Sequence, residues 1–330
     1  MKKIFALLLS AALLVTLLAA CGGGNTTDTD TDAQEPATDA STTQVEEKEP
    51  DTGDASKDDP LNQDEIGEKE LLVVSFGTSY NDSRRETIGA IEKAMQTAFP
   101  DYSVRRAFTS QIIIDHVKDR DGVTIDNVEQ ALERAVNNGV KTLVVQPTHL
   151  MNGLEYEELT DELAKYSDSF EKIAIGDPLL TSDADFEAVM TAITDATKDA
   201  ADGKTAICFM GHGTTADSNS VYSKMQTLLT DKGFNDYYVG TVEATPSLDD
   251  VLAAVQKGSY EKVVLRPLMI VAGDHANNDM AGDEDDSWKS TFEKAGYTVD
   301  CQVEGLGQLE AIQQLFVEHA KAAVASAEAE

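Results

Sequence analysis

Short apolar runs alternate with amphipathic segments along the chain, from about residue 71 to residue 303. Runs of this length are typical of buried strands, whereas apolar residues spaced three or four positions apart are typical of helices that bury one face. Because strand and helix alternate, the pattern predicts βαβ units and parallel sheets. The folded part is therefore predicted to be an α/β protein.

The two halves of this pattern have the same order of elements. The first half predicts strands at residues 71–76, 104–108, 142–146 and 172–176, and helices at residues 83–99, 112–118, 127–138 and 155–166. The second half predicts strands at residues 206–210, 237–242, 262–266 and 298–303, and helices at residues 219–232, 248–256 and 288–295. Each half thus contains four predicted strands.

Local sequence supports a duplication. Val-Ser-Phe-Gly-Thr at residues 74–78 matches Met-Gly-His-Gly-Thr at residues 210–214, and residues 142–147 match residues 262–267. Such a repeat predicts two similar Rossmann-like domains, each with a parallel four-stranded sheet. We expect an N-terminal domain over residues 71–200, a C-terminal domain over residues 201–330 and a cleft between them lined by strand ends.

Three metal-capable side chains follow predicted strands in the second half. His212, Glu243 and His275 each lie past the end of an apolar run. The carboxyl ends of parallel strands share one edge of the sheet, so these side chains are predicted to converge. Two imidazoles and a carboxylate suit divalent cobalt, iron, nickel or zinc and leave coordination positions vacant. The first half has Phe76 in place of His212, so the site is expected only in the second half.

The first twenty residues have the pattern of a secretory signal peptide. Lys2 and Lys3 precede an apolar stretch, which ends in Leu-Ala-Ala before Cys21. A cysteine after small residues is similar to the bacterial lipobox, in which the cysteine is lipidated and becomes the mature N-terminus. We therefore expect an extracytoplasmic lipoprotein anchored to the membrane at the cell surface or in the periplasm. The alternatives are an ordinary signal peptide with a chance cysteine, or a single membrane anchor.

Residues 21–70 are predicted to be a lipidated cysteine followed by a disordered acidic linker. From residue 22 to residue 70 the segment has 16 acidic residues and 3 lysines, and few large apolar side chains. It cannot bury enough surface to offset the entropy of ordering. The formal charge of the whole chain is −34. An acidic chain of this kind is not expected to bind nucleic acid.

The ordered set of motifs resembles the anaerobic-type sirohydrochlorin cobaltochelatase family, which has the class II chelatase fold. The resemblance covers residues 71–325. In the first half it is carried by the opening Val-Ser-Phe-Gly-Thr-Ser at 74–79. In the second half it is carried by Gly-His-Gly-Thr at 211–214, by Glu243 beside Thr-Pro, and by Gly-Asp-His-Ala-Asn-Asn-Asp-Met at 273–280. It implies that His212, Glu243 and His275 bind the metal beside a tetrapyrrole in the cleft. His212 would be the principal base, because an imidazole can accept a proton and also bind metal.

The resemblance implies a Co²⁺ substrate, with Fe²⁺ or Ni²⁺ as alternatives, and no nucleotide. Residues 76–79 lack the lysine of a phosphate-binding loop. Tentative contacts to the tetrapyrrole are Gly77, Thr78, Ser79, His149 and Arg266. For His149 a hydrogen-bonded structural role is an equal alternative.

A polycarboxylate substrate requires cations in the cleft. The candidates share a place at strand ends or in the first helix and are Arg84, Arg85, Arg105, Arg106, Lys224 and Arg266. For most of them we favour a surface charge paired with nearby acids. The acidic residues around His275 are interpreted as a solvated loop. Outside residue 21, Cys208 and Cys301 lie in strand-like sequence and are expected to be small buried hydrophobic residues, although pairing stays open.

Three hypotheses follow from the sequence. The first is a chelatase that inserts cobalt or iron into a tetrapyrrole such as sirohydrochlorin and releases two pyrrole protons. The second is an extracytoplasmic lipoprotein that binds haem, another tetrapyrrole or a metal for uptake. The third is a zinc hydrolase, which lacks an evident base beyond the ligands. The oligomeric state, a homo-oligomer included, is left open by the sequence.

Overall fold

The computed structural model of this chain describes residues 52–329. The predicted signal peptide at residues 1–20 and the predicted lipidation site at Cys21 lie outside this range. Among the described residues, no helix has both the length and the apolar character needed to cross a membrane.

The first sheet is parallel and contains four strands in the order β2-β1-β3-β4. Its strands are β1 (Lys69–Ser75), β2 (Ser103–Phe108), β3 (Thr142–Pro147) and β4 (Lys172–Ile175). The central strand β1 is buried along almost its whole length. Helices cover both faces of such a sheet, which explains why its strands are continuous apolar runs in the sequence. All four predicted strands of this half are confirmed.

Helices follow the strands of the first sheet, and the amphipathic pattern predicts all of them except the one over residues 183–197. They are α1 (Asn81–Glu86), α2 (Ile88–Ala98), α3 (Gln111–Asp121), α4 (Val128–Asn137), α5 (Leu154–Ala164) and α6 (Asp183–Thr197). The single helix predicted over residues 83–99 is wrong in one respect, because it breaks at Thr87. The hydroxyl of Thr87 donates to the carbonyl of Ser83 at 2.6 Å. A side chain bonded back in this way competes with regular helical hydrogen bonds.

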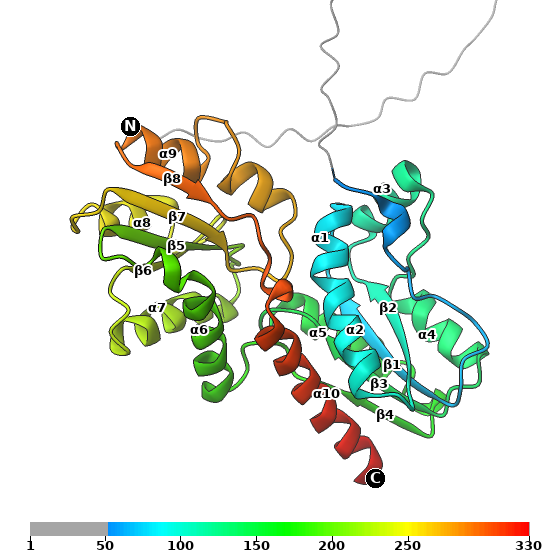
Figure 1. The fold of residues 1–330 in the computed structure, drawn as a ribbon. Coiled ribbons are helices and arrows are strands. Elements are labelled where there is room, and N and C mark those ends of the chain that lie inside the picture. The colour runs from blue at the N-terminus through cyan, green and yellow to red at the C-terminus, as the bar shows by residue number, and fades with distance from the viewer. Residues whose placement is uncertain (1–51, 330) are drawn as a thin grey trace, which may run out of the picture. The chain divides into compact units, whose positions relative to one another are not determined.

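The second sheet repeats the topology of the first, with strands in the order β6-β5-β7-β8. Its strands are β5 (Thr205–Gly211), β6 (Tyr237–Thr241), β7 (Lys262–Pro267) and β8 (Thr298–Cys301). The registers also match: Val74 pairs with Pro147 in the first sheet, and Met210 pairs with Pro267 in the second. The predicted duplication of a parallel four-stranded α/β unit is therefore confirmed (Figure 1).

Four helices belong to the second half. They are α7 (Ser220–Asp231), α8 (Leu248–Val255), α9 (Trp288–Lys294) and α10 (Glu310–Ala329), and a π-helical turn covers Ala276–Met280. Cys208 is buried on β5 and Cys301 is partly buried on β8, and both are free thiols.

Two helices join the halves by packing away from their own sheets. Helix α10, at the end of the second half, contacts β3, β4 and α2 of the first half (Figure 1). Helix α6, which ends the first half, packs on α7, and the hydroxyls of Thr197 and Tyr237 lie 3.0 Å apart. The boundary predicted at residue 200 stays a prediction, but helices from both sides of it share one core.

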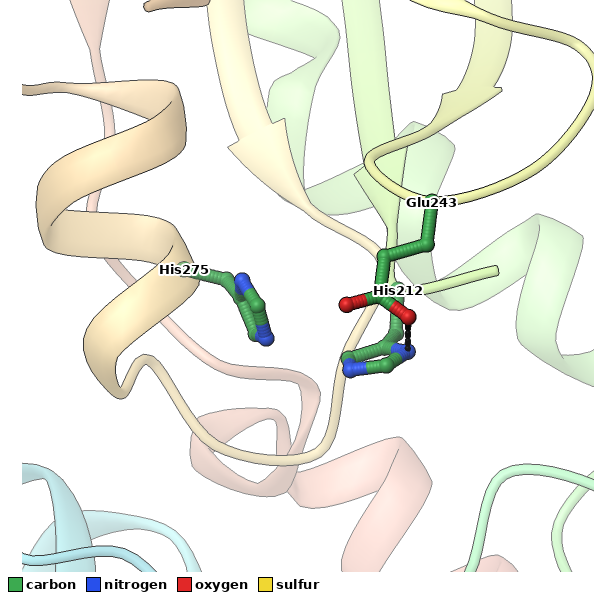
Figure 2. A group of neighbouring side chains, drawn as sticks. All are labelled: His212, Glu243 and His275. Atoms are coloured by element: carbon green, nitrogen blue, oxygen red, sulfur yellow. Dashed lines mark ion pairs between the residues drawn. The ribbon is translucent and has the colours of Figure 1, made fainter. Parts of the chain in front are cut away.

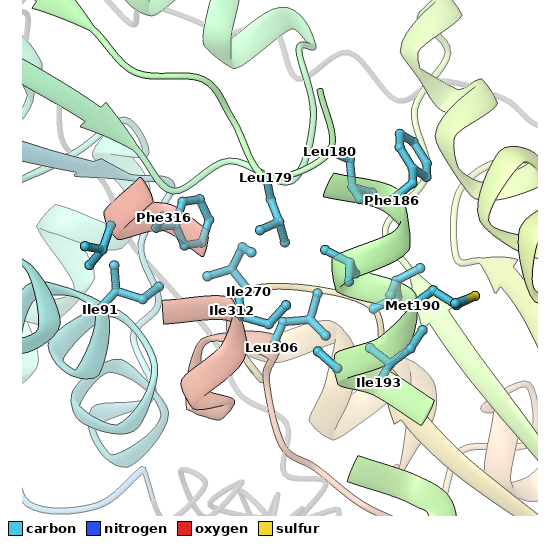
Figure 3. Packing of buried hydrophobic residues seen from close by; sticks show 14 of the residues in the cluster. Ile91, Leu179, Leu180, Phe186, Met190, Ile193, Ile270, Leu306, Ile312 and Phe316 are labelled. Atoms are coloured by element: carbon cyan, nitrogen blue, oxygen red, sulfur yellow. The ribbon is translucent and has the colours of Figure 1, made fainter. Parts of the chain in front are cut away.

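This shared core contains apolar residues from helices and connections of both halves, together with strand residues such as Val73 and Ile207. Leu179, Phe186, Ile270, Ile312 and Phe316 are all buried in the same cluster (Figure 3). Burying such side chains is worth roughly 1.5–3 kcal/mol each. The core therefore fixes the two sheets against one another.

The linker prediction needs a correction at its C-terminal end. Residues 52–68 were predicted to be disordered, but they pack on the first half. Leu61 is 7 % exposed, and the Asp58 side chain is 3 % exposed between Arg84 and Arg106. The buried side chains of Leu61 and Asp58 thus fix a segment that its composition predicts to be disordered.

Candidate metal centre

The ends of β5 and β6 place the first two metal-capable side chains. His212 follows β5 directly, and Glu243 lies two residues beyond β6. The pairing of the two strands continues past their ends, because the Val242 amide donates to the Gly211 carbonyl at 3.0 Å and the Glu243 amide donates to the His212 carbonyl at 2.9 Å. His212 and Glu243 are therefore held side by side by the backbone.

His275 completes the group from the connection that follows β7. The three residues offer ligand atoms that all lie within 4.8 Å of one another, and within residues 52–329 they are the one group of three His, Cys, Asp or Glu side chains that does so. The two imidazole rings meet edge to face, with centroids 4.6 Å apart (Figure 2). The predicted convergence of His212, Glu243 and His275 is borne out by this geometry.

The group is open to solvent. The side chains of His212 and Glu243 are about half exposed, at 49 % and 57 %, and the His275 side chain is 32 % exposed. The Nδ1 atom of His212 lies 3.9 Å from Oε2 of Glu243. An open group of two nitrogens and one carboxylate leaves coordination positions for a second ligand of the metal.

Each imidazole is oriented by an oxygen acceptor at its Nδ1 atom. Nδ1 of His212 lies 2.8 Å from the Gly213 carbonyl, and Nδ1 of His275 lies 2.8 Å from Oδ2 of Asp279. If Nδ1 donates in both contacts, Nε2 is the free ligand atom. Asp279 was interpreted as part of a solvated loop, but it fixes His275. Its spacing of four residues from His275, on one turn of helix, is the sequence signal that was missed.

Gly213 is required by the tight turn that presents His212. Its φ is +89°, and a Cβ atom built on it would lie 2.9 Å from Ala244. A residue with a side chain would be strained in this conformation. The turn therefore depends on glycine in order to bring His212 close to the segment that carries Glu243.

The first half has a counterpart of this group without its ligands. By register, Phe76 corresponds to His212, and Ser110 corresponds to Glu243. The Ser110 amide donates to the Phe76 carbonyl at 3.3 Å, as the Glu243 amide does to His212. Phe76 is 49 % exposed and offers an apolar ring instead of an imidazole. The duplicated frame is thus asymmetric in its chemistry, as the sequence predicts.

The loop after β1 contains three of the tentative substrate contacts. Gly77 has a φ of +103° and packs against the ring of Phe108, while Thr78 is 3 % exposed. The hydroxyl of Thr78 lies close to Gly273, at 3.0 Å from the place that a Cβ atom would take on this glycine. The Ser79 carbonyl accepts a hydrogen bond from Arg120 at 2.6 Å. This loop therefore touches the segment that leads to His275. A direct contact with substrate stays a prediction for these residues.

His149 is buried beyond the end of β3. It is 9 % exposed, and neither ring nitrogen has a hydrogen-bond partner. Burial lowers the pKa of His149 to about 4, although the carboxylate of Glu155 opposes this effect. The imidazole is therefore neutral near pH 7, and the predicted hydrogen-bonded structural role lacks a partner.

The six candidate cations are all engaged by acidic side chains. Arg266 is almost fully buried and donates to Glu304 at 2.8 Å, and Lys224 pairs with Asp183. The remaining four also have acidic partners; they are Arg84, Arg85, Arg105 and Arg106. The preference for paired charges is confirmed. Three of the arginines are fully buried, however, and not at the surface as expected.

A pocket lies at the junction of the halves, next to the segment that leads to His275. Its lining includes Tyr80 and Ser83 from the first half and Ala272 and Asn277 from the second. The Ala272 amide donates to the Ser83 hydroxyl at 3.0 Å. The three metal-capable residues do not line this pocket, so the cluster is a separate, open feature.

Loss of a ligand is expected to weaken cobalt binding strongly. We expect His275→Ala to raise the Kd for Co²⁺ by at least about 100-fold, and Asp279→Asn to raise it roughly 10-fold, because outer partners orient their ligands. Competition titration against a chromophoric chelator measures both values. His116→Ala is the matched control, since His116 is exposed on α3. Equal affinity of His275→Ala and the control would exclude this cluster as the metal site.

The buried, neutral His149 should make the fold sensitive to acid. Its folded pKa, about 4, is below its ordinary value of 6.5. Its contribution to stability is therefore complete above pH 6.5 and is lost as the pH falls towards 4, by roughly 3 kcal/mol. Met269 is the residue of the second half that corresponds to His149. The variant His149→Met should therefore fit this position, and it should remove the loss of stability because methionine does not titrate. Denaturant titrations of the wild type and the variant at pH 7 and pH 4.5 measure the free energy of unfolding. An equal loss in both chains would contradict the assignment of this acid sensitivity to His149.

Comparisons with known proteins agree with this fold. The family described as "Cobalt chelatase (CbiK)" matches residues 69–325. A sirohydrochlorin cobaltochelatase of Salmonella typhimurium is 38 % identical over 76 % of this chain and 94 % of its own length. The sirohydrochlorin cobaltochelatase CbiKC of Nitratidesulfovibrio vulgaris is 30 % identical over 78 % of this chain and 91 % of its own length.

Solved structures share the fold at low sequence identity. SirB from Bacillus subtilis with Fe³⁺ aligns with a TM-score of 0.57 at 14 % identity, covering 80 % of this chain and 98 % of that one. The sirohydrochlorin chelatase SirB from Bacillus subtilis subspecies spizizenii, in complex with cobalt, aligns with a TM-score of 0.54 at 15 % identity over the same shares. Because the family model covers most of the chain and a relative is 38 % identical over 94 % of its own length, the chain belongs to the cobalt chelatase family.

Proposed function

We propose that this chain inserts a divalent metal ion, cobalt in the first place, into a tetrapyrrole of the sirohydrochlorin type. The reaction exchanges one metal dication for two pyrrole N–H protons, so the macrocycle gains four metal–nitrogen bonds and releases two protons. Neither an oxidant nor a nucleotide is needed for this balance. The relatives named as sirohydrochlorin cobaltochelatases support this substrate class.

The open cluster of His212, Glu243 and His275 is the observation on which the proposal depends. Its ligand atoms lie within 4.8 Å of one another and face solvent. A structural metal site would be closed by a fourth protein ligand, whereas an open site lets a second ligand approach the bound ion. In a chelatase that second ligand is the macrocycle. Two neutral ligands and one carboxylate hold the metal weakly enough for transfer.

His212 is assigned two roles, as ligand and as principal base. An imidazole in the neutral form can take up a proton as the metal leaves it. Glu243 balances the charge of the dication, and Asp279 holds His275 in place. The exposed Phe76, in the equivalent position of the first half, offers an apolar face instead of another ligand. All of the proposed metal ligands therefore come from the second half.

Cobalt is the metal that the family assignment favours. Fe²⁺ and Ni²⁺ are included in the proposal because a set of two imidazoles and one carboxylate discriminates poorly among these ions. Availability of the ion, in addition to affinity, then decides which metal is inserted.

The test is a spectrophotometric assay of cobalt insertion into sirohydrochlorin by the detergent-solubilised full chain. We expect catalytic turnover, and a loss of at least about 100-fold in kcat/KM for His212→Ala, because this variant lacks both a ligand and a base. His116→Ala should keep the wild-type rate. Stoichiometric tetrapyrrole binding without turnover would favour the alternative of an uptake lipoprotein. Wild-type activity of His212→Ala would contradict the assigned role.

We also propose that the enzyme acts outside the cytoplasm and is held at the membrane by a lipid on Cys21. The basic, apolar and small-residue regions that precede Cys21 support this location. The acidic residues that follow would then form part of the tether to the folded unit.

Replacing the lipidated cysteine should release the protein. We expect Cys21→Ser to move the chain from the membrane fraction to the soluble fraction or to leave an unprocessed precursor, since no thioether can form. Fractionation with immunoblotting measures this, and mass spectrometry of the wild-type N-terminus should show an acylated cysteine. An unmodified Cys21 in the mature wild-type chain would refute the anchor.

A further inference from the structure

A short segment before the family-matching region packs on the first half of the fold. We call residues 52–61 the N-terminal strut; the family match begins later, at residue 69. The Asp82 amide donates to the Thr52 carbonyl at 2.9 Å, and the Arg106 amide donates to the Leu61 carbonyl at 3.1 Å. The strut is thereby bonded to α1 and to β2.

Asp58 is the centre of the strut's attachment. Arg84 Nε lies 2.6 Å from the Asp58 carboxylate, and two nitrogens of Arg106 lie 2.7 and 3.0 Å from it. Glu92 binds Arg106 from the other side at 2.7 Å. All four side chains are at most 3 % exposed. Although burial opposes ionisation, hydrogen bonds from Arg106 and Arg84 hold the pKa of Asp58 below its ordinary value.

The charges of this cluster balance only when the strut is present. Two guanidinium groups face two carboxylates, and one of the carboxylates is Asp58. Without it, Arg84 would lose its carboxylate hydrogen-bond partner, and Arg106 would keep only Glu92. An uncompensated buried charge is strongly unfavourable. The strut therefore supplies a group that the family-matching part of this chain requires.

Arg84 connects Asp58 to the loop that touches the segment leading to His275. Its NH1 group donates to the Thr78 carbonyl at 3.0 Å, and its NH2 group donates to Oδ1 of Asn81 at 2.5 Å. The Thr78 hydroxyl packs against Gly273, at 3.0 Å from the position that a Cβ would take. Gly273 lies two residues before His275. A continuous series of contacts thus leads from the strut to a metal ligand.

A second contact holds the same two segments together. Ser83, the residue before Arg84, accepts a hydrogen bond from the Ala272 amide at 3.0 Å. The segment of residues 78–83, which is a loop followed by the start of α1, is therefore fixed on one side by the strut and on the other side supports residues 272–273. Displacement of this segment would change the position from which His275 enters the cluster.

We propose that Asp58 is a positioning residue, through which the strut holds the 78–83 segment against residues 272–273 and keeps His275 in register with His212 and Glu243. The proposal rests on the proposed function for its effect on catalysis. The predicted effect of Asp58 on cobalt binding requires only that His212, Glu243 and His275 bind the ion, whether or not the chain inserts it into a tetrapyrrole.

The experiment compares Asp58→Asn and the double variant Asp58→Asn/Arg84→Met in the full chain. Asp54→Asn is the matched control, because Asp54 lies in the strut but is exposed. Asp58→Asn should lower the melting temperature and raise the Kd for cobalt about tenfold. The double variant removes the unpaired buried charge, so it should regain stability while the Kd stays raised. Asp54→Asn should match the wild type in both measurements.

The separation of stability from affinity decides between positioning and a merely structural role. If affinity recovers together with stability in the double variant, the positioning role is overturned. A Kd within twofold of the wild type in either variant also overturns it. If Asp58→Asn does not fold, the double variant alone still gives the answer. Failure of the proposed function is a different result: the wild type would insert no cobalt, while its cobalt affinity would still report on the strut.

Discussion

The metal centre depends on the parallel pairing of β5 with β6 and β7. Parallel pairing brings the carboxyl ends of these strands to one edge, and the backbone bonds between the residues after β5 and those after β6 extend it to His212 and Glu243. No long loop has to be ordered to place these two ligands. His275 comes from a longer connection, and it is the ligand that needs outside support from Asp279 and from the first half.

The duplicated frame carries the three metal-capable residues in one half only. The two sheets share topology and register, yet Phe76 replaces the imidazole in the first half. A symmetric pair of metal clusters would compete for the ion on both sides of a flat substrate. Holding the ion on one side leaves the other side free to contact the macrocycle. The crossing helices α6 and α10 keep the two halves in one core, so this asymmetry is presented in a fixed arrangement.

The sequence predicted the parts of the molecule that local patterns determine. All eight strands follow from apolar runs, and His212 and Glu243 were found in the residues that come just after two of these runs. Helices α6 and α10 were not predicted. The packing of α10 on the first sheet could not be predicted either, because an amphipathic helix does not specify which sheet it covers. The ordered strut was missed for a similar reason. Asp58 looks like one more acid in an acidic linker, and its partners Arg84 and Arg106 are 26 and 48 residues away in sequence.

The most direct test follows the metal itself. The chain is loaded with one equivalent of cobalt, freed of unbound ions and mixed with sirohydrochlorin in the absence of any other cobalt. The account predicts that cobalt bound by His212, Glu243 and His275 appears in the macrocycle, up to one equivalent per chain, with release of two protons. Cobalt that stays on the protein, with insertion only after free cobalt is added, would contradict a delivery role for this cluster.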